Sequence, residues 1–257
     1  MVTDALEDAL RVGPKFIYVL PNFQNPTGVT LAFERRRKLI ELADRYGVPI
    51  VEDDPYGQLR FEGQHLPSVV VLDEEYQDNG HKFYRGNVIY LSTFSKTLAP
   101  GLRLAYVVAP PEVIRKLVQA KQGTDLHTAT FNQMVAYETA RGGFLDQHIK
   151  TIRQVYHHRR NVMIDVMERT FPPGVRWTRP AGGLFLWVTT PEGLATAEVL
   201  KVAIEHKVAF VPGAPFFPTG GGHNTMRLNY SNASPEMIEL GISRLGAVLR
   251  EMMTITV

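Results

Sequence analysis

Short apolar runs alternate with amphipathic stretches in the first part of the chain. Apolar runs bounded by proline, glycine or polar residues are typical of buried strands. Residues 33–46 instead carry charged side chains beside leucine, isoleucine and alanine, and Gly47 follows, which predicts an amphipathic helix. Strands separated by helices favour right-handed crossovers and a mostly parallel sheet. The predicted strands are 15–20, 48–53, 88–92 and 104–109.

The pattern changes after a long amphipathic stretch at 145–170, which ends before Pro172. The short apolar runs and helical stretches that follow are typical of an α+β domain. We therefore predict an α/β large domain over residues 1–148 and a smaller C-terminal α+β domain over 149–257, with the long helix as the hinge. The further predicted helices are 111–122, 131–140, 196–207 and 235–252, and the further strands are 184–188, 208–211 and 226–230.

Composition changes this picture little. The 257 residues are 44% hydrophobic and 21% charged, and the net charge of +2 gives no reason to expect nucleic acid or an anionic membrane as a partner. The absence of cysteine excludes disulfides and zinc–cysteine sites, and the histidines show no spacing suited to a metal. No apolar run approaches the roughly 18 residues of a membrane span. The N-terminus has no signal-peptide pattern, so we expect a cytoplasmic protein.

Polar residues follow the ends of three predicted strands. Asn25 lies after the first strand, Asp53 ends the second, and Ser95 and Lys96 follow the third. The carboxyl ends of parallel strands form the edge at which ligands bind in open α/β sheets. Each residue alone has a simpler interpretation, because a lysine after a strand is usually solvated and Asn-Pro-x-Gly is a common turn. Their combination therefore carries more weight than any one of them.

Four segments together closely resemble the signature motifs of the class I and II aminotransferases, which are fold-type I enzymes that depend on pyridoxal 5'-phosphate (PLP). They are Asn-Phe-Gln-Asn-Pro-Thr-Gly at 22–28, Asp-Asp-Pro-Tyr at 53–56, Ser-Thr-Phe-Ser-Lys at 92–96 with Arg103, and Arg-Leu-Asn-Tyr at 227–230. Further segments at 118–128, 132–134 and 208–213 are most similar to the 2-aminoadipate aminotransferase branch. The resemblance implies the PLP-dependent transferase fold, with part of its large domain followed by the small domain.

The resemblance implies that Lys96 binds PLP as a Schiff base and then acts as general base and acid. Asp53 would pair with the pyridine nitrogen, so that the ring can accept negative charge. Asp54 is an open alternative for this role, although the three-residue spacing to Tyr56 favours Asp53. Tyr56 and Asn25 would hydrogen-bond the phenolate oxygen of the ring, and the peptide bond after Asn25 is often cis in this motif.

The remaining implied contacts are to anionic groups. Thr93, Ser95 and Arg103 stand where the family binds the cofactor phosphate, and Thr93 replaces the commoner serine. Arg227, together with Asn25, would bind the substrate α-carboxylate, because a guanidinium forms a bidentate pair with it.

The resemblance implies transfer of an amino group from an L-amino acid to a 2-oxo acid, with 2-aminoadipate, leucine-like or aromatic amino acids as donors. It also implies a homodimer in the complete protein. One alternative is another PLP reaction on the same scaffold, such as β-elimination or decarboxylation. A second is a sensor domain of a winged-helix transcription regulator, in which nucleic acid would be bound by an upstream domain.

Several features of the family have no counterpart in this sequence. They are an N-terminal arm, a glycine- or serine-rich loop that binds the phosphate, and an aromatic residue that stacks on the pyridine ring. We therefore expect the chain to correspond to the C-terminal part of such a protein. Its sheet would then lack several strands and present an exposed edge and an apolar face.

Overall fold

The computed structural model describes residues 1–77 and 83–255. The chain forms two compact units. Unit 1 comprises Met1–Asn22, Thr30–Leu59 and Gly63–Thr151, and unit 2 comprises Phe23–Val29, Arg60–Glu62 and Ile152–Val257. Two short segments from the first quarter of the sequence thus belong to the C-terminal unit.

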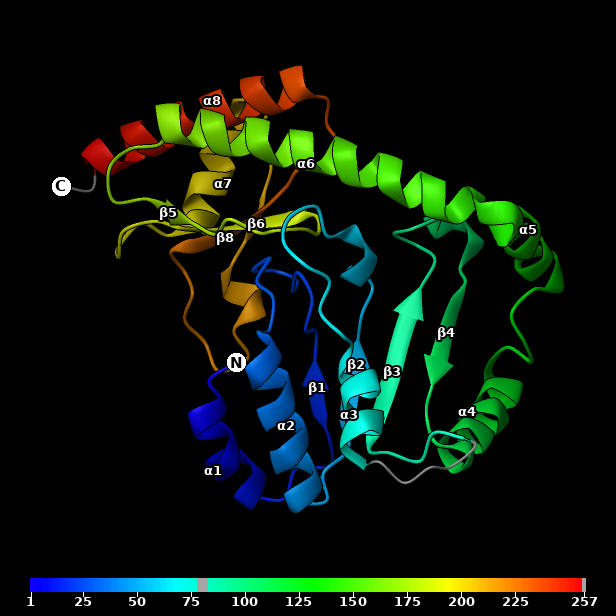
Figure 1. Ribbon diagram of the computed structural model, residues 1–257. Helices are drawn as coiled ribbons and strands as arrows, with labels where there is room; N and C mark the ends of the chain where they lie inside the picture. The colour runs from blue at the N-terminus through cyan, green and yellow to red at the C-terminus, as the bar shows by residue number, and fades with distance from the viewer. Residues whose placement is uncertain (78–82, 256–257) are drawn as a thin grey trace. The chain divides into compact units, whose positions relative to one another are not determined.

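Unit 1 contains a four-stranded sheet in the order β1-β2-β3-β4 (Figure 1). Strands β1, β2 and β3 are parallel, and β4 runs antiparallel to β3. The predicted mostly parallel sheet is confirmed. Strand β4 is antiparallel to β3, so no crossover connection joins these two strands. A turn at 94–98 and a short 3-10 helix return the chain without a crossover helix, and such a short connection can only join antiparallel strands. The strands are β1 (Ile17–Val19), β2 (Ile50–Asp53), β3 (Val88–Thr93) and β4 (Ala105–Val108).

Three helices cover one face of this sheet (Figure 1). They are α1 (Leu6–Arg11), α2 (Phe33–Arg45) and α3 (Val69–Gln77), of which only α2 was predicted. Their apolar side chains pack with those of the strands into one core, which explains why the sheet is buried on this side. Its members include Leu10, Leu39, Ile40, Ile50, Val69, Leu72 and Val88.

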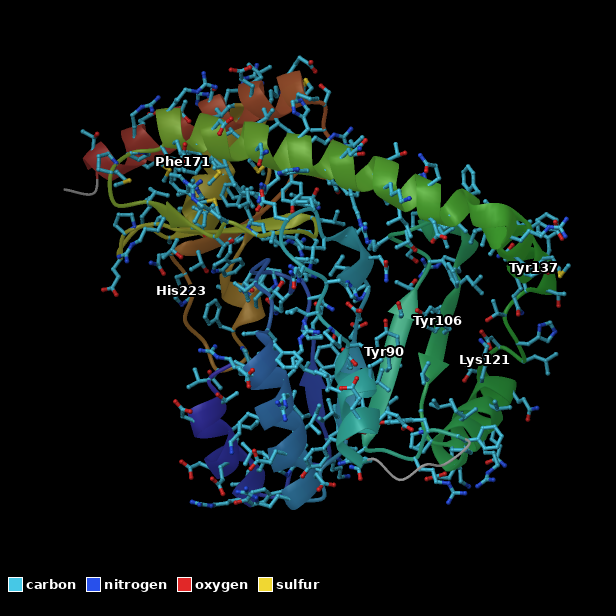
Figure 2. The ribbon with its side chains drawn as sticks, in the orientation of Figure 1. Tyr90, Tyr106, Lys121, Tyr137, Phe171 and His223 are labelled. Carbon is cyan, nitrogen blue, oxygen red and sulfur yellow. The ribbon has the colours of Figure 1, made fainter. Side chains whose placement is uncertain are left out.

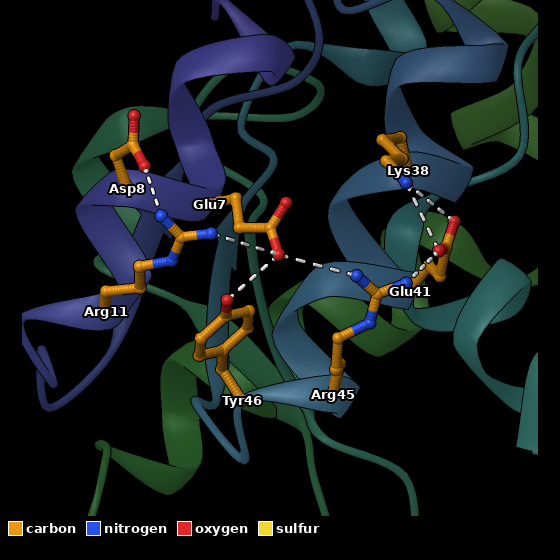
Figure 3. Close-up of polar contacts among 7 residues, drawn as sticks. All are labelled: Glu7, Asp8, Arg11, Lys38, Glu41, Arg45 and Tyr46. Carbon is orange, nitrogen blue, oxygen red and sulfur yellow. Dashed lines mark hydrogen bonds and ion pairs between the residues drawn. The ribbon is translucent and has the colours of Figure 1, made fainter.

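Glu7 joins α1 to α2 on the surface (Figure 3). Its carboxylate accepts a hydrogen bond from the Tyr46 hydroxyl at 2.9 Å and forms ion pairs with Arg45 and Arg11 at 3.5 and 3.9 Å. Exposed pairs of this kind contribute roughly 0–1 kcal/mol each. The buried leucines of α1 therefore contribute more to its docking than Glu7 does.

The β4 edge of the sheet is exposed in the described part of the chain. All four residues of β4 are exposed, including Tyr106, Val107 and Val108. The helices that follow, α4 (Pro111–Thr124) and α5 (Thr130–Ala140), also expose large apolar residues such as Phe131 and Tyr137. The exposure of β4 agrees with the exposed edge expected from the sequence.

Unit 2 is an α+β unit with an antiparallel sheet in the order β5-β6-β8-β7. Its core combines this sheet with α6, α7 and α8, which lie over one face of the sheet (Figure 1). The elements are α6 (Phe144–Thr170), which begins in unit 1, β5 (Arg176–Trp177), β6 (Phe185–Thr189), α7 (Thr196–Glu205), β7 (Val211–Pro212), β8 (Thr225–Asn229) and α8 (Pro235–Ile255). The 3-10 helices among the described residues are η1 (Thr3–Ala5), η2 (Gly57–Leu59), η3 (Pro100–Leu102), η4 (Arg141–Gly143) and η5 (Ala214–Phe216).

The predicted strand at 208–211 was wrong for most of its length. Only Val211 and Pro212 pair with β8. The N–H of Val208 instead donates to the carbonyl of Ala203 at 2.9 Å and closes the end of α7. Residues of a short apolar run can therefore end a helix instead of forming a strand.

The short segment Arg60–Glu62 of unit 2 is fixed by long-range contacts. The N–H of Phe61 donates to the carbonyl of Ala181 at 3.0 Å, and the buried guanidinium of Arg160 pairs with Glu62. His157 of α6 also contacts Glu62 at 3.0 Å, and its ring stacks on Phe61 at 5.4 Å. His157 therefore contributes to fixing this segment.

Gly183 is expected to tolerate alanine poorly. It has φ +76°, and a Cβ there would lie 2.5 Å from the Cβ of Phe23, whereas Gly193 has φ +93° and open space around it. Gly193→Ala should lower the free energy of unfolding by about 1–2 kcal/mol through the left-handed backbone alone. Gly183→Ala should cost about 3 kcal/mol, because steric overlap adds to that strain. Urea denaturation of both variants tests this, and equal losses would contradict it.

Candidate functional site

One face of the unit 1 sheet carries the predicted carboxylate. Asp53 is the last residue of β2 and is half-buried. The Tyr18 hydroxyl on neighbouring β1 donates to Asp53 Oδ2 at 2.6 Å. Burial, and next the bond to Asp53, raises the pKa of Tyr18 well above its ordinary value. Tyr18 therefore stays a hydrogen-bond donor at neutral pH and orients this carboxylate.

The alternative carboxylate, Asp54, faces the other way. Successive strand residues point to opposite faces, so Asp54 lies on the side covered by helices. It is buried, and its Oδ1 accepts hydrogen bonds from Asn22 Nδ2 at 3.0 Å and the Gly57 N–H at 2.9 Å. The Tyr90 hydroxyl donates to Oδ2 at 3.2 Å. The Asp54 carboxylate is thus engaged by the protein on both oxygens.

Tyr90 and Tyr106 lie side by side on β3 and β4, with their ring centroids 6.1 Å apart (Figure 2). They line a hollow of about 230 Å³ together with Asp54 and the start of α6. Burial, and next the Asp54 carboxylate, raises the pKa of Tyr90 above its ordinary value. Asp54 borders this hollow, whereas Asp53 lies on the opposite face of the sheet.

The predicted lysine lies in a turn directly after β3. The N–H groups of Leu98 and Ala99 both donate to the carbonyl of Phe94, at 2.8 and 3.1 Å, which closes one helical turn around Lys96. Lys96 is half-buried. Within residues 1–77 and 83–255, no side chain forms a hydrogen bond or ion pair with its amine. Its amine is therefore available for chemistry.

Two hydroxyls precede Lys96. Thr93 Oγ1 and Ser95 Oγ are 2.9 Å apart, and the Ser95 N–H donates to Thr93 Oγ1 at 3.1 Å. Thr93 ends β3, and Asp53 pairs with Leu91 two residues earlier, so these groups lie at the same edge of adjacent strands. Arg103 follows with φ +52°, and its exposed guanidinium donates to the Pro100 carbonyl at 2.9 Å. Tyr56 is buried in the turn after β2.

In unit 2, the structure brings Arg227 and Asn25 together across about two hundred residues of sequence. Arg227 Nη1 donates to Asn25 Oδ1 at 2.6 Å. The guanidinium lies over the rings of Phe185 and Phe216, at 4.4 and 5.4 Å from their centroids. The Asn25–Pro26 peptide bond is cis, as the motif implied. Aromatic faces and one amide therefore orient the predicted carboxylate-binding group.

Tyr18 is the site residue that the sequence analysis missed. It lies in the strand 15–20, where the alternation of exposed and buried positions puts Tyr18 opposite Val19. Register with β2 pairs it with Val51, which places it on the face of Asp53. A tyrosine at the outward position of a strand was the available signal, but its partner depended on the register.

Glu52 is a buried acid next to the site. It accepts hydrogen bonds from the N–H groups of Val69 and Val70 at 2.8 and 2.9 Å, at the start of α3. Burial raises the pKa of Glu52 to about 7, the two backbone bonds oppose this, and Asp54 raises and Arg36 lowers the same pKa more weakly.

Glu52→Gln is expected to remove a pH dependence of stability. The folded chain holds a proton on Glu52 up to about pH 7, while the ordinary pKa is 4.5, so the free energy of unfolding should fall as pH rises between these values. The total loss is about 3 kcal/mol. Urea denaturation at several pH values should show this slope in the wild type and in the exposed control Glu75→Gln. Persistence of the slope in Glu52→Gln would contradict the assignment.

Two other types of feature are missing from the described residues. No cluster of three or more histidine, aspartate or glutamate side chains there could hold a metal ion. No helix there combines the length and apolar character needed to cross a membrane.

The chain is similar to known proteins in both sequence and fold. The family model described as aminotransferase class I and II matches residues 1–245. The chain is 46% identical over 255 residues to aromatic-amino-acid aminotransferase 1 of Thermococcus litoralis, covering 98% of this chain and 59% of that protein. It is 32% identical over 243 residues to an uncharacterized HTH-type transcriptional regulator of Bacillus subtilis, covering 95% of this chain and 48% of the regulator.

Among solved structures, the α-aminoadipate aminotransferase LysN of Thermus thermophilus, complexed with N-(5'-phosphopyridoxyl)-L-leucine, has a TM-score of 0.92 and 44% identity. The match covers 99% of this chain and 64% of that one. The chain thus spans about three fifths of the aminotransferases it matches. The predicted fold and the similarity to the 2-aminoadipate branch are confirmed. The chain belongs to the class I and II aminotransferase family.

Proposed function

We propose that the full-length gene product is a PLP-dependent aminotransferase that moves an amino group from an L-amino acid to a 2-oxo acid. The observation that carries this proposal is the edge of the unit 1 sheet, where Tyr18 orients Asp53 and Lys96 follows the adjacent strand. Membership of the family supports it. The proposed donors are 2-aminoadipate, leucine-like and aromatic amino acids, because the similar enzymes are named for such substrates or were crystallised with a leucine adduct of the cofactor.

The side chains of unit 1 fit PLP by their chemistry. Lys96 offers an amine that no described side chain occupies, and Asp53 Oδ1 has no hydrogen-bond partner among the described residues. Thr93 and Ser95 offer adjacent hydroxyls, and Arg103 offers a cation for the phosphate. When bound, PLP supplies an electron sink for the bond that breaks at the amino acid α-carbon.

Each residue then has a defined task. The Lys96 amine would hold the cofactor covalently and, once released, would take the proton from the substrate α-carbon and return it. Asp53 would keep a proton on the pyridine nitrogen, because its carboxylate would stabilise the positive charge there. By resemblance to the family, Tyr56 and Asn25 would hydrogen-bond the ring oxygen. Arg227 binds the substrate α-carboxylate, with its guanidinium oriented by Asn25 and the flanking aromatic rings.

We further propose that the protein is a cytoplasmic homodimer and that its domains divide at residues 148 and 149, within α6. The exposed apolar residues of β4, α4 and α5 support additional contacts in the complete protein, because patches of this kind are usually covered.

The test uses the full-length gene product with added PLP. The visible absorbance of lysine-bound PLP should appear and then bleach when 2-aminoadipate, leucine or phenylalanine is added. A 2-oxo acid should form without release of ammonia or carbon dioxide, which separates transamination from β-elimination and decarboxylation. An absorbance band that no amino acid bleaches would contradict the enzyme and favour a sensor domain.

A further inference from the structure

Arg36 is a fully buried cation in unit 1. It lies on α2, and its guanidinium donates to the carbonyls of Leu31 at 3.0 Å, Pro67 at 2.7 Å and Pro21 at 3.2 Å. Its Nη2 also donates to Asn22 Oδ1 at 2.6 Å. A buried guanidinium is costly unless its donors are satisfied, and here three carbonyls and one amide oxygen accept from it. Because an arginine can only donate hydrogen bonds, Arg36 also fixes the orientation of the polar groups that accept from it.

Asn22 links Arg36 to Asp54 through its side-chain amide. An arginine can only donate hydrogen bonds, so the amide oxygen of Asn22 must face Arg36 and its amide nitrogen must face away. That nitrogen donates to Asp54 Oδ1 at 3.0 Å, and Asn22 is buried with only 3% of its surface exposed. The three side chains thus form a hydrogen-bond chain with one possible orientation.

Asp54 ends the chain inside the predicted cofactor motif. It directly follows Asp53 and precedes Tyr56 by two residues. Its Oδ1 also accepts the N–H of Gly57, which closes the turn, and a Cβ on Gly57 would lie only 2.4 Å from Asp54 Oδ2. The turn that carries Asp53 and Tyr56 is therefore held by the side chain of Asp54.

We propose that Arg36 and Asn22 are positioning residues for the cofactor site, acting through Asp54 on the turn that carries Asp53 and Tyr56. This inference rests on the proposed function. Arg36 and Asn22 touch neither cofactor nor substrate. Their role is to fix the orientation of the Asp54 carboxylate and thereby the conformation of the backbone on each side of Asp54.

The test measures PLP binding by the full-length gene product and the pH midpoint of the visible absorbance of bound PLP. Asn22→Asp keeps the acceptor for Arg36 but removes the donor to Asp54. We expect it to weaken PLP binding by about tenfold or more, the equivalent of one charged hydrogen bond, and to shift the pH midpoint. Arg36→Met should act in the same direction, while Arg37→Met, an exposed arginine on the same helix, should change neither quantity.

Asp54→Asn separates positioning from charge. Its amide oxygen can still accept from Asn22 and Gly57, so a positioning role predicts a smaller loss of PLP affinity than that of Asn22→Asp. A role for the negative charge of Asp54 predicts the reverse order and would overturn the proposal. So would variants whose melting temperature falls while PLP affinity and pH midpoint stay at wild-type values. A wild type without a Lys96-dependent absorbance band would overturn the proposed function together with this inference, whereas an unchanged band in all variants overturns the inference alone.

Discussion

Lys96→Ala is expected to abolish the visible absorbance of lysine-bound PLP and to lower kcat by at least about 10³-fold. The loss combines covalent attachment of the cofactor with proton transfer, and a positioned acid–base group alone contributes about 10²–10⁴-fold. Lys96→Arg should behave similarly, because it keeps the positive charge but offers no amine that can form the covalent bond. Absorbance spectra and steady-state rates of the full-length gene product measure both effects.

Lys121 provides the matched control. It is an exposed lysine on α4, paired with Asp125 at 2.9 Å (Figure 2). Lys121→Ala should therefore leave spectrum and rate unchanged. An intact absorbance band in Lys96→Ala would assign the covalent attachment to another lysine and show that Lys96 does not bind PLP.

The carboxyl edge of the sheet could be predicted because it depends on local patterns. Asp53 and Lys96 each follow an apolar run, and parallel strands bring such ends to one edge. The choice between Asp53 and Asp54 could not be made from spacing alone. Strand register separates the two carboxylates, since alternation assigns Asp54 to the helix-covered face with Asn22 and Asp53 to the face of Tyr18, and we base the proposal for Asp53 on this difference.

Helix α3 shows why other elements escaped prediction. Its first residues, Val69, Val70 and Val71, are β-branched and have a strand-like preference. The helix begins there because Glu52 accepts the N–H groups of Val69 and Val70 from a strand 17 residues earlier in the sequence. A cap supplied from a distant strand leaves no local signal, so tertiary contact overrides propensity.

The interleaving of the two units has the same origin. Segment Phe23–Val29 belongs to unit 2 through contacts such as the Thr178 hydroxyl donating to the Thr27 carbonyl at 2.9 Å and Gly183 packing on Phe23. These pairs are more than 150 residues apart. A sequence read from one end to the other therefore predicts a single boundary, whereas packing assigns the Asn25 segment to the unit that contains Arg227.

Asp53→Asn is expected to lower kcat by about 10²–10³-fold, the usual cost of removing one preorganised charge-stabilising group. The visible band of bound PLP should remain, because Lys96 is intact. Tyr18→Phe should cause a smaller loss, since it removes one hydrogen bond to Asp53 Oδ2 and leaves the carboxylate in place. Asp54→Asn is the matched comparison, with the same chemical change on the opposite face of the sheet. If Asp54→Asn lost activity while Asp53→Asn kept it, the carboxylate that protonates the ring would have to be Asp54, and the assignment from strand register would be wrong.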